Sequence, residues 1–466
     1  MLLYNTKSRT IEEFIPHDSK KVKLYTCGPT VYSYAHIGNL RCYIMEDILE
    51  KSLRYLGFNV KRAMNITDVG HLSSDSDTGE DKMVKGAIKE HKSVLELAKF
   101  YTDKFFDDCA KLNIKKPEIV VPATTCIPLY IDMITRLLEK GYAYFSNGNV
   151  YFDTSKLKEY YVLSNHNEEE LIVGAREDVS LDENKKNKAD FVLWFTKSKF
   201  ADQELKWESP WGLGYPGWHI ECSCIALKYL GEYLDIHCGG VDNIFPHHTN
   251  EIAQTESYIG HPWCKYWYHV EHLNDQNGKM SKSKGGTLTV DTLIKEGYDP
   301  LAYRFFCLQS HYRNQLVFSN ESLNSASNAY QKLKNKIFQI KEEGIIDEKQ
   351  VKKYQDLFKN NLENDLNIAE ALTTLYAVIK DNDLSGKSKI FLIKDFDQVL
   401  SLSLLENKKA EVSKELLNYI NSEIERRNIA KKNKNYALAD EIRESLKEKN
   451  IIIKDTREGT TFEIIK

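Results

Sequence analysis

The sequence of 466 residues has no run of about 18 consecutive apolar residues, the length that a membrane-spanning helix needs. Its first residues, MLLYNTKSRTIEEF, lack the cationic start and apolar segment of a secretory signal. A charge excess is also lacking, because 64 Lys and Arg are balanced by 68 Asp and Glu, for a net charge of −4. We therefore expect a cytoplasmic chain with no membrane partner, in which a local basic patch would bind any polyanion.

Cysteine is scarce, with nine residues in the whole chain. This odd number argues against a disulfide framework and fits a reducing compartment, where thiols serve as metal ligands or small buried apolar groups. Apolar residues at 42% and charged residues at 28% are ordinary globular values, which excludes disorder as the main state. The length predicts about three domains rather than one small module.

Residues 22–66 have the pattern of a strand, a helix and a second strand. An apolar run ends at the Cys27-Gly28-Pro29 turn, apolar residues then recur at helical spacing as far as Leu56, and alternation follows Gly57. This unit predicts a parallel sheet with a right-handed crossover, the opening of a nucleotide-binding α/β fold.

The remaining chain changes pattern twice. Asn147-Gly148 joins two alternating segments and predicts a β-hairpin, while residues 164–190 are polar and predict a surface excursion. Beyond His311 the chain becomes largely helical. We predict an α/β fold with a Rossmann-like parallel-sheet catalytic core, a connective insertion, an α-helical bundle and a small C-terminal module. The predicted ranges are 1–116 and 207–275 for the core, 117–206 for the insertion, 276–310 for a lysine-containing loop and its flank, 311–405 for the bundle and 406–466 for the terminal module.

Two motifs are suited to binding a nucleotide. His36-Ile37-Gly38-Asn39 lies at the predicted start of a helix, where unpaired N–H groups and the helix dipole favour phosphate. His36 and Asn39 are three apart and can both donate hydrogen bonds from one face. The alternative for this motif is a capped turn with a satisfied histidine. The loop NGKMSKSKGG, 277–286, places lysines between glycines, and these ammonium groups can neutralise charge as pyrophosphate leaves.

A third group combines metal-binding residue types. Cys27, Cys222, His247 and Glu251 form a legitimate zinc set, and the last two are four apart on a predicted helix. On spacing alone, Cys224 competes with Cys222, and His237 or His248 competes with His247.

HIGN near residue 36 together with KMSKS near residue 280 is the pattern of class I aminoacyl-tRNA synthetases. Over essentially its whole length the chain resembles the cysteinyl-tRNA synthetases. The matching stretches are LYTCGPTVY, NITD at 65–68, DFVLW at 190–194, SPWGLGYPGWHIECS, DIHCGGVDNIFPHHTNEIAQ, YALADEIR and DTREGTTF. The resemblance implies a ligase that activates L-cysteine with ATP to cysteinyl-adenylate and transfers it to the 3′-terminal ribose of tRNA-Cys.

The resemblance also implies residue roles. One zinc ion per chain is held by Cys27, Cys222, His247 and Glu251 and recognises the substrate thiolate. The cysteine pocket consists of Cys27, Thr67, Trp218 and His237. ATP, accompanied by magnesium, contacts His36, Gly38, Asn39, Lys279 and Lys282, all of which except Gly38 are expected to be catalytic. The flank after the lysine loop is expected to contact the tRNA stem.

The terminal module is expected to read tRNA. Residues 424–450 contain eight basic and five acidic residues, a plausible phosphate footprint. Tyr436 and Phe462 are candidates for stacking on unpaired bases, Lys431 for a phosphate, and Asp440 and Asp455 for base edges. The alternative is an amphipathic helix with Tyr436 packed in a core.

The sequence departs from the family pattern at three places. Asn39 stands where the commonest motif has a second histidine, and Tyr215 stands where arginine is expected, which removes a charge near the pocket. The segment 69–83 predicts a surface loop, in which His71 and several acids leave a second metal site open. Two other functions stay open, a ligase that joins cysteine to a small-molecule amine and a non-catalytic zinc-containing tRNA-binding paralogue. We expect a monomer.

Overall fold

The computed structural model describes residues 1–69, 93–164, 184–197, 205–275, 278–279, 288–406, 414–449, 451–456 and 459–464. The chain forms two compact units, Met1–Leu404 and Leu405–Lys466. None of the described helices is long and apolar enough to cross a membrane.

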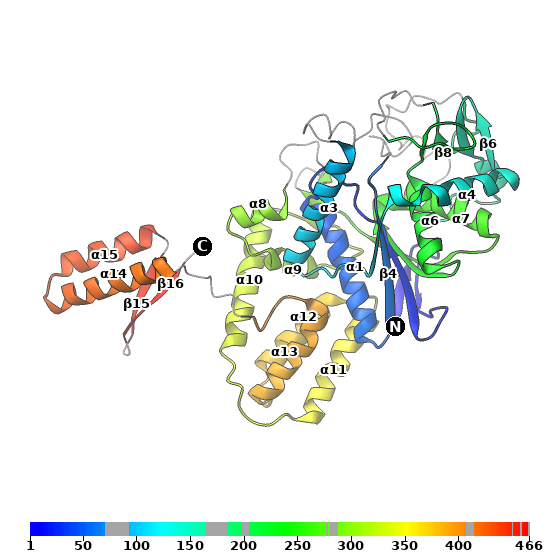
Figure 1. The fold of residues 1–466 in the computed structure, drawn as a ribbon. Helices are drawn as coiled ribbons and strands as arrows, with labels where there is room; N and C mark the ends of the chain where they lie inside the picture. The colour runs from blue at the N-terminus through cyan, green and yellow to red at the C-terminus, as the bar shows by residue number, and fades with distance from the viewer. Residues whose placement is uncertain are drawn as a thin grey trace. The chain divides into compact units, whose positions relative to one another are not determined.

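A five-stranded parallel sheet lies at the centre of the first unit (Figure 1). Its strands, in spatial order, are β11 (Cys264–Val270), β10 (Leu234–Gly240), β3 (Lys21–Thr26), β4 (Asn59–Ile66) and β5 (Ile119–Pro122). The helix α1 (Ile37–Tyr55) connects β3 to its parallel neighbour β4. The predicted strand, helix and strand are therefore confirmed, as is the α/β fold class.

Helices cover both faces of this sheet (Figure 1). One face carries α1 and α3 (Val94–Lys111), and the other carries α4 (Ile127–Glu139), α6 (His219–Leu230) and α7 (Thr249–Ile259). Because both faces are covered, the strands read as nearly continuous apolar runs, and β4 is buried at six of its eight positions.

The insertion is a four-stranded antiparallel sheet. Its strands are β6 (Ala143–Ser146), β7 (Asn149–Phe152), β8 (Phe191–Phe195) and β9 (Tyr215–Pro216). Asn147 and Gly148 both have positive φ, 45° and 93°, so the predicted hairpin is confirmed. The edges differ from the predicted 117 and 206, because β5 pairs with β4 in the central sheet and β9 pairs with β8 in the insertion. Of the predicted surface excursion, residues 165–183 lie outside the described residues.

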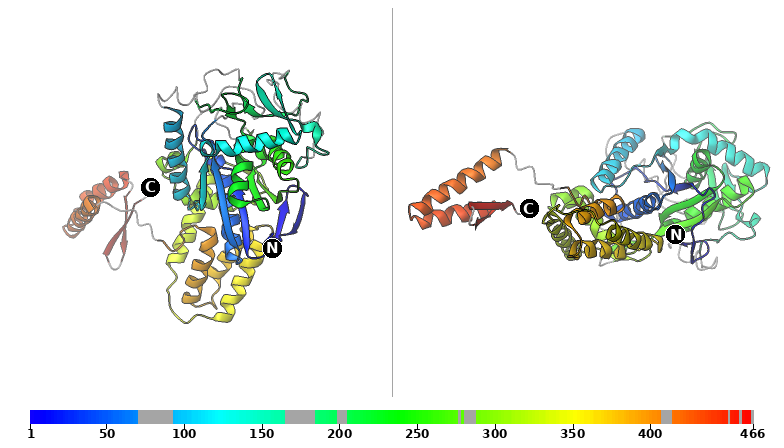
Figure 2. Two further views of the ribbon diagram at one scale, coloured as in Figure 1. Left: turned by 45° about the vertical axis from the view of Figure 1, so that its right-hand side comes forward. Right: turned by 90° about the horizontal axis from the view of Figure 1, so that it is seen from below.

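A small three-stranded sheet and two helices follow the core. Strand β12 (Leu273–Asp275) lies between β13 (Gly278–Lys279) and β14 (Leu316–Val317), and the helices are α8 (Val290–Lys295) and α9 (Pro300–Leu308). Four longer helices follow. The first, α10 (Asn320–Phe338), packs on α9, and α11 (Glu348–Glu363), α12 (Ile368–Lys380) and α13 (Gly386–Leu400) pack on one another. Figure 2 shows α11 to α13 grouped beside the C-terminal end of α1, where Tyr55 donates to Asp395 at 2.6 Å. The N-terminal hairpin consists of β1 (Leu2–Asn5) and β2 (Thr10–Glu13).

The second unit contains two helices and a hairpin. These are α14 (Lys414–Lys432), α15 (Tyr436–Glu448), β15 (Ile451–Thr456) and β16 (Gly459–Ile464). Its core consists of Ile420, Ile442, Leu446, Ile451 and Ile453, and Phe462 packs against them.

Candidate active site

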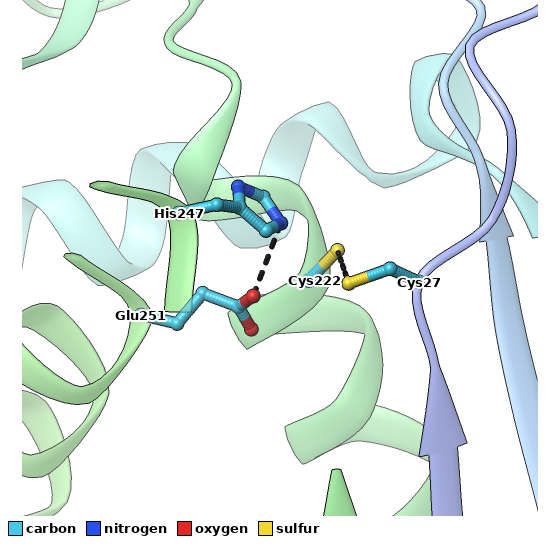
Figure 3. A group of neighbouring side chains, drawn as sticks. All are labelled: Cys27, Cys222, His247 and Glu251. Carbon is cyan, nitrogen blue, oxygen red and sulfur yellow. Dashed lines mark hydrogen bonds and ion pairs between the residues drawn. The ribbon is translucent and has the colours of Figure 1, made fainter. Parts of the chain in front are cut away.

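The predicted metal ligands meet beyond the carboxyl ends of the central strands. Cys27 follows β3, Cys222 lies in the first turn of α6, His247 lies in the π-helical turn η4 (Ile244–His248), and Glu251 lies in the first turn of α7. Figure 3 shows the four side chains pointing toward one another. This edge of a parallel sheet is where ligands bind in open α/β folds.

The four donor atoms lie within 4.8 Å of one another. The sulfur atoms of Cys27 and Cys222 are 3.9 Å apart, and His247 Nε2 lies 3.1 Å from Glu251 Oε1 (Figure 3). With Zn–S bonds of about 2.3 Å, two sulfur ligands of a tetrahedral zinc lie about 3.8 Å apart. The observed spacing and the mixed S, N and O donors therefore suit a zinc ion.

A second group overlaps the first. Cys27, His237, His248 and Glu251 also have ligand atoms within 4.8 Å of one another, so the geometry leaves the histidine alternatives open. Cys224 is in neither group, because its sulfur lies 3.7 Å from Leu129 O and from Met133 Sδ, on another side of α6. The thiol alternative is thus removed.

The surroundings of the two thiols shift their pKa values in opposite directions. Burial raises the pKa of Cys27, helped by its hydrogen bond to Cys222. Burial opposes ionisation of Cys222 too, but the hydrogen bond from Cys27 and the nearby His247 lower its pKa to about 6. Glu251 and Cys222 outweigh burial and raise the pKa of His247 to about 10. Cys222 is therefore the thiol that the surroundings favour as a thiolate.

The predicted pocket residues border the metal group. The Trp218 ring stacks on His247 at 4.1 Å between ring centroids. His237 Nε2 lies 2.9 Å from Glu251 Oε2, and its ring stacks on Trp267. The Thr67 hydroxyl is fixed by two hydrogen bonds, since it donates to Glu221 at 2.7 Å and accepts from Asn65 at 3.0 Å.

The turn after β3 is packed tightly on the end of β4. Gly28 N donates to Asn65 Oδ1 at 2.7 Å, and a Cβ added at Gly28 would lie 1.6 Å from the carbonyl oxygen of Asn65. Only glycine fits there, and this contact fixes the position of Cys27.

The nucleotide motif forms a reciprocal cap at the start of α1. His36 Nδ1 accepts from Asn39 N at 3.2 Å, and Asn39 Oδ1 accepts from His36 N at 3.4 Å. Because Nδ1 is an acceptor, the neutral ring carries its proton on Nε2. This cap is the alternative that the sequence left open for the motif, and the i, i+3 spacing of His36 and Asn39 is that of a capping box. Gly38 contacts the His36 ring, since an added Cβ would lie 2.9 Å from it.

A chain of buried histidines, which was not predicted from the sequence, lies behind Cys27. His248 Nε2 lies 3.3 Å from Cys27 Sγ, His248 Nδ1 lies 2.8 Å from His269 Nε2, and His269 Nδ1 lies 2.7 Å from Thr6 Oγ1. On the other side, His219 Nδ1 lies 3.0 Å from His247 Nδ1 and so turns His247 Nε2 toward Glu251. The adjacent histidines His247 and His248 were the only sign of this chain in the sequence. In the structure the His247 ring faces Glu251, and the His248 ring faces Cys27 and His269.

Other predicted residues lie elsewhere. Lys282 and His71 are outside the described residues, and for Lys279 only the backbone, in β13, is described. Tyr215 is buried in the insertion sheet and stacks on Phe195 at 5.0 Å. The tyrosine at this position therefore serves the packing of the insertion.

The predicted tRNA contacts differ in their surroundings. Tyr436 is 62% exposed, so the alternative of a core position is wrong, and Asp440 is exposed as well. Asp455 instead accepts two hydrogen bonds from Arg427, at 2.8 and 2.9 Å, and one from Lys431 at 2.7 Å.

Comparison with known proteins places these features in context. Residues 13–328 match the family model described as tRNA synthetases class I (C) catalytic domain. The chain is 46% identical to a curated cysteine–tRNA ligase of Treponema denticola, over 99% of each chain, and 45% identical to one of Borrelia hermsii, over 98% of each. It is also similar in fold to methionyl-tRNA synthetase of Mycobacterium tuberculosis in complex with methionyl-adenylate. That match has a TM-score of 0.54 at 14% identity and covers 85% of this chain and 93% of that one.

Proposed function

Because the chain belongs to the cysteine–tRNA ligase family of class I tRNA synthetases, we propose that it activates L-cysteine with ATP and transfers the cysteinyl group to the 3′-terminal ribose of tRNA-Cys. The observation that carries the proposal is the buried group of two thiols, an imidazole and a carboxylate at the carboxyl edge of the sheet. In an enzyme of this family such a group has an evident task, the recognition of a substrate thiol.

Selection of cysteine over serine is the central difficulty of this reaction. The two amino acids are nearly isosteric, and an apolar pocket separates such analogues by only about 1–3 kcal/mol. A zinc ion held by Cys27, Cys222, His247 and Glu251 would bind a thiolate in preference to a hydroxyl that stays protonated. Selection at binding then removes the need for an editing domain.

The residues around this group would orient the amino acid. We propose that Trp218, stacked on His247, forms one wall of the cysteine pocket. His237 is fixed by Glu251 and Trp267 and would form the floor. The Thr67 hydroxyl has a set direction because Asn65 donates to it and Glu221 accepts from it.

Activation of the carboxylate takes place at the start of α1. The cysteine carboxylate attacks the α-phosphate of ATP, a bond to that phosphorus forms, and pyrophosphate leaves. His36 would donate from Nε2, since Nδ1 is engaged with the backbone of Asn39, and the dipole of this 19-residue helix favours the developing charge. Because Asn39 Oδ1 caps the helix, its Nδ2 group is the one turned to the ligand. Lys279 and Lys282 would neutralise the leaving pyrophosphate, and magnesium accompanies ATP as part of the substrate.

The second step transfers the acyl group to the 2′-hydroxyl of the terminal ribose. We propose that the terminal module binds the tRNA through Tyr436, whose exposed ring can stack on an unpaired base, and Asp440, which can accept from a base edge. Lys431 is 39% exposed and would contact a phosphate. Asp455 is occupied by Arg427 and Lys431, so we assign it to holding these cations in place.

The proposal is tested by ATP–pyrophosphate exchange with cysteine and serine in parallel, with and without a zinc chelator. We expect exchange with cysteine, much less with serine, and loss of exchange when zinc is removed. Charging of tRNA-Cys is then measured directly. Exchange without charging would favour ligation of cysteine to a small amine, and absence of cysteine-dependent exchange would favour a non-catalytic tRNA-binding protein.

A further inference from the structure

Arg41 is completely buried in the first half of α1, two residues after the nucleotide motif. Its guanidinium donates to four backbone carbonyls. Nη1 donates to Glu271 O at 2.5 Å and to His272 O at 2.6 Å, while Nη2 donates to Asn314 O at 2.6 Å and to His311 O at 3.3 Å. A buried cation is costly unless it is hydrogen-bonded, and both Nη atoms of Arg41 are, although its Nε has no hydrogen-bond partner among the described residues. The four charge-assisted bonds therefore hold the carbonyls in place.

The four carbonyls belong to the two segments that enter the small sheet. Residues 271–272 lead directly into β12, and residues 311–314 lead into β14. These two strands pair in parallel, with Leu273 opposite Leu316. Arg41 therefore holds both strands at their starting points, and it does so from the helix that carries His36.

The strand β12 also pairs with β13, the strand that contains Lys279. Asn274 pairs with Lys279 across the antiparallel β12–β13 contact. The path from His36 to Lys279 thus runs through α1, the Arg41 guanidinium and β12. A second connection lies on the other side of the lysine motif. Ile37 N, at the start of α1, donates to Leu288 O at 2.9 Å.

From this connection we propose that Arg41 is a positioning residue for ATP, which sets the separation between the start of α1 and β12, the strand on which the Lys279 strand β13 is paired. The inference rests on the proposed function, since it assumes that these two elements bind the same nucleotide. It assigns no direct contact with ATP to Arg41.

The test compares Arg41→Lys with the same substitution at Arg304, a second buried arginine, which lies in α9 and contacts α1 through Asp47. Lysine keeps the charge but cannot reproduce the guanidinium fork that reaches four carbonyls. Arg304 is equally buried and donates to Asp47 of α1 at 2.7 Å and to Leu400 O at 2.8 Å, without contacting β12 or β14 through these bonds. Arg304→Lys therefore controls for the general effect of replacing a buried arginine.

Binding and kinetics are measured on the full-length protein. The binding constant is the Kd for a non-hydrolysable ATP analogue, the kinetic constants are the KM values for ATP and for cysteine in pyrophosphate exchange, and zinc content is measured alongside. For Arg41→Lys we expect the Kd and the KM for ATP to rise about ten- to hundredfold, with zinc content and the KM for cysteine unchanged. For Arg304→Lys both nucleotide constants should stay near the wild-type values. Unchanged nucleotide constants in Arg41→Lys, or equal rises in the two variants, would overturn the inference.

A milder variant covers the case in which Arg41→Lys does not fold. Asn274 Nδ2 donates to Gln315 Oε1 at 3.1 Å, an exposed bond between β12 and the residue that precedes β14. Asn274→Ala should raise the Kd for the analogue about threefold, and no change would count against the role of this strand pair. A wild-type protein that binds the analogue but shows no cysteine-dependent exchange would refute the proposed function and leave the Arg41 prediction open to the binding measurement.

Discussion

Replacement of Gly28 by alanine tests how the turn after β3 positions the metal group. The added Cβ would lie 1.6 Å from the carbonyl oxygen of Asn65, and real Cβ contacts essentially never fall below 3.0 Å. The turn and β4 must therefore separate by at least about 1.4 Å before the alanine side chain fits at this position. Overpacking of this kind costs about 2 kcal/mol of unfolding free energy.

The same displacement acts on the neighbouring ligand. Cys27 is adjacent to Gly28, and its sulfur lies 3.9 Å from that of Cys222, close to the spacing that one zinc ion requires. A shift of more than about 1 Å is large compared with the tolerance of about 0.2 Å for metal–ligand distances. We expect Gly28→Ala to bind zinc substoichiometrically after gel filtration and to have a raised KM for cysteine.

Gly57→Ala is the matched control. Gly57 has φ +97° and no heavy atom within 4 Å of an added Cβ, so alanine there costs about 1 kcal/mol through backbone strain alone. Zinc is measured by mass spectrometry of the digested protein, and stability by urea unfolding. Full zinc occupancy and a normal KM for cysteine in a folded Gly28→Ala protein would refute the argument.

Three further substitutions test separate parts of the molecule. Cys222→Ser should lower zinc affinity by more than about 100-fold and raise the KM for cysteine, whereas Cys224→Ser, on the same helix, should leave both unchanged in a metal titration and exchange assay. Lys282→Ala should slow adenylate formation by about 100-fold in a single-turnover experiment while tRNA affinity changes little, and the reverse pattern would remove it from the ATP site. Hydrogen bonds from Arg427 and Lys431 lower the pKa of Asp455 in the folded state, so its stabilising effect is present above the ordinary aspartate pKa and is lost as the pH falls toward the folded-state value. Asp455→Asn should accordingly lower the melting temperature at neutral pH and weaken its decrease in acid, and identical melting curves across pH would contradict this role.

Short-range patterns in the sequence predicted the local structure well. The strand, helix and strand of residues 22–66 and the Asn147-Gly148 hairpin follow from periodicity and from backbone preferences that neighbouring residues determine. The choice between Cys222 and Cys224 was also within reach. Two residues that are two apart on a helix do not share a face, so only one of these thiols can point toward Cys27.

Long-range partners were not accessible in the same way. Asp455 lies beyond the basic segment 424–450, and only the fold brings it to Arg427, 28 residues away. Tyr215 lies in a stretch that resembles a pocket motif, yet its strand joins the insertion sheet. Likewise, the contacts of Arg41 span 230 to 273 positions, a separation at which periodicity carries no information.

The sequence separation within the metal group has a consequence for the synthesis of the chain. Cys27 and Cys222 are 195 positions apart, and Glu251 lies further on, beyond the whole insertion. A nascent chain therefore exposes Cys27 long before its partners have left the ribosome, and no N-terminal fragment that ends before residue 251 can complete the group. Closing so long a loop has a large entropic cost that the central sheet must meet first. Assembly of the four side chains is thus a late event, and a metal ion bound by all four would report that β3, α6 and α7 have come together.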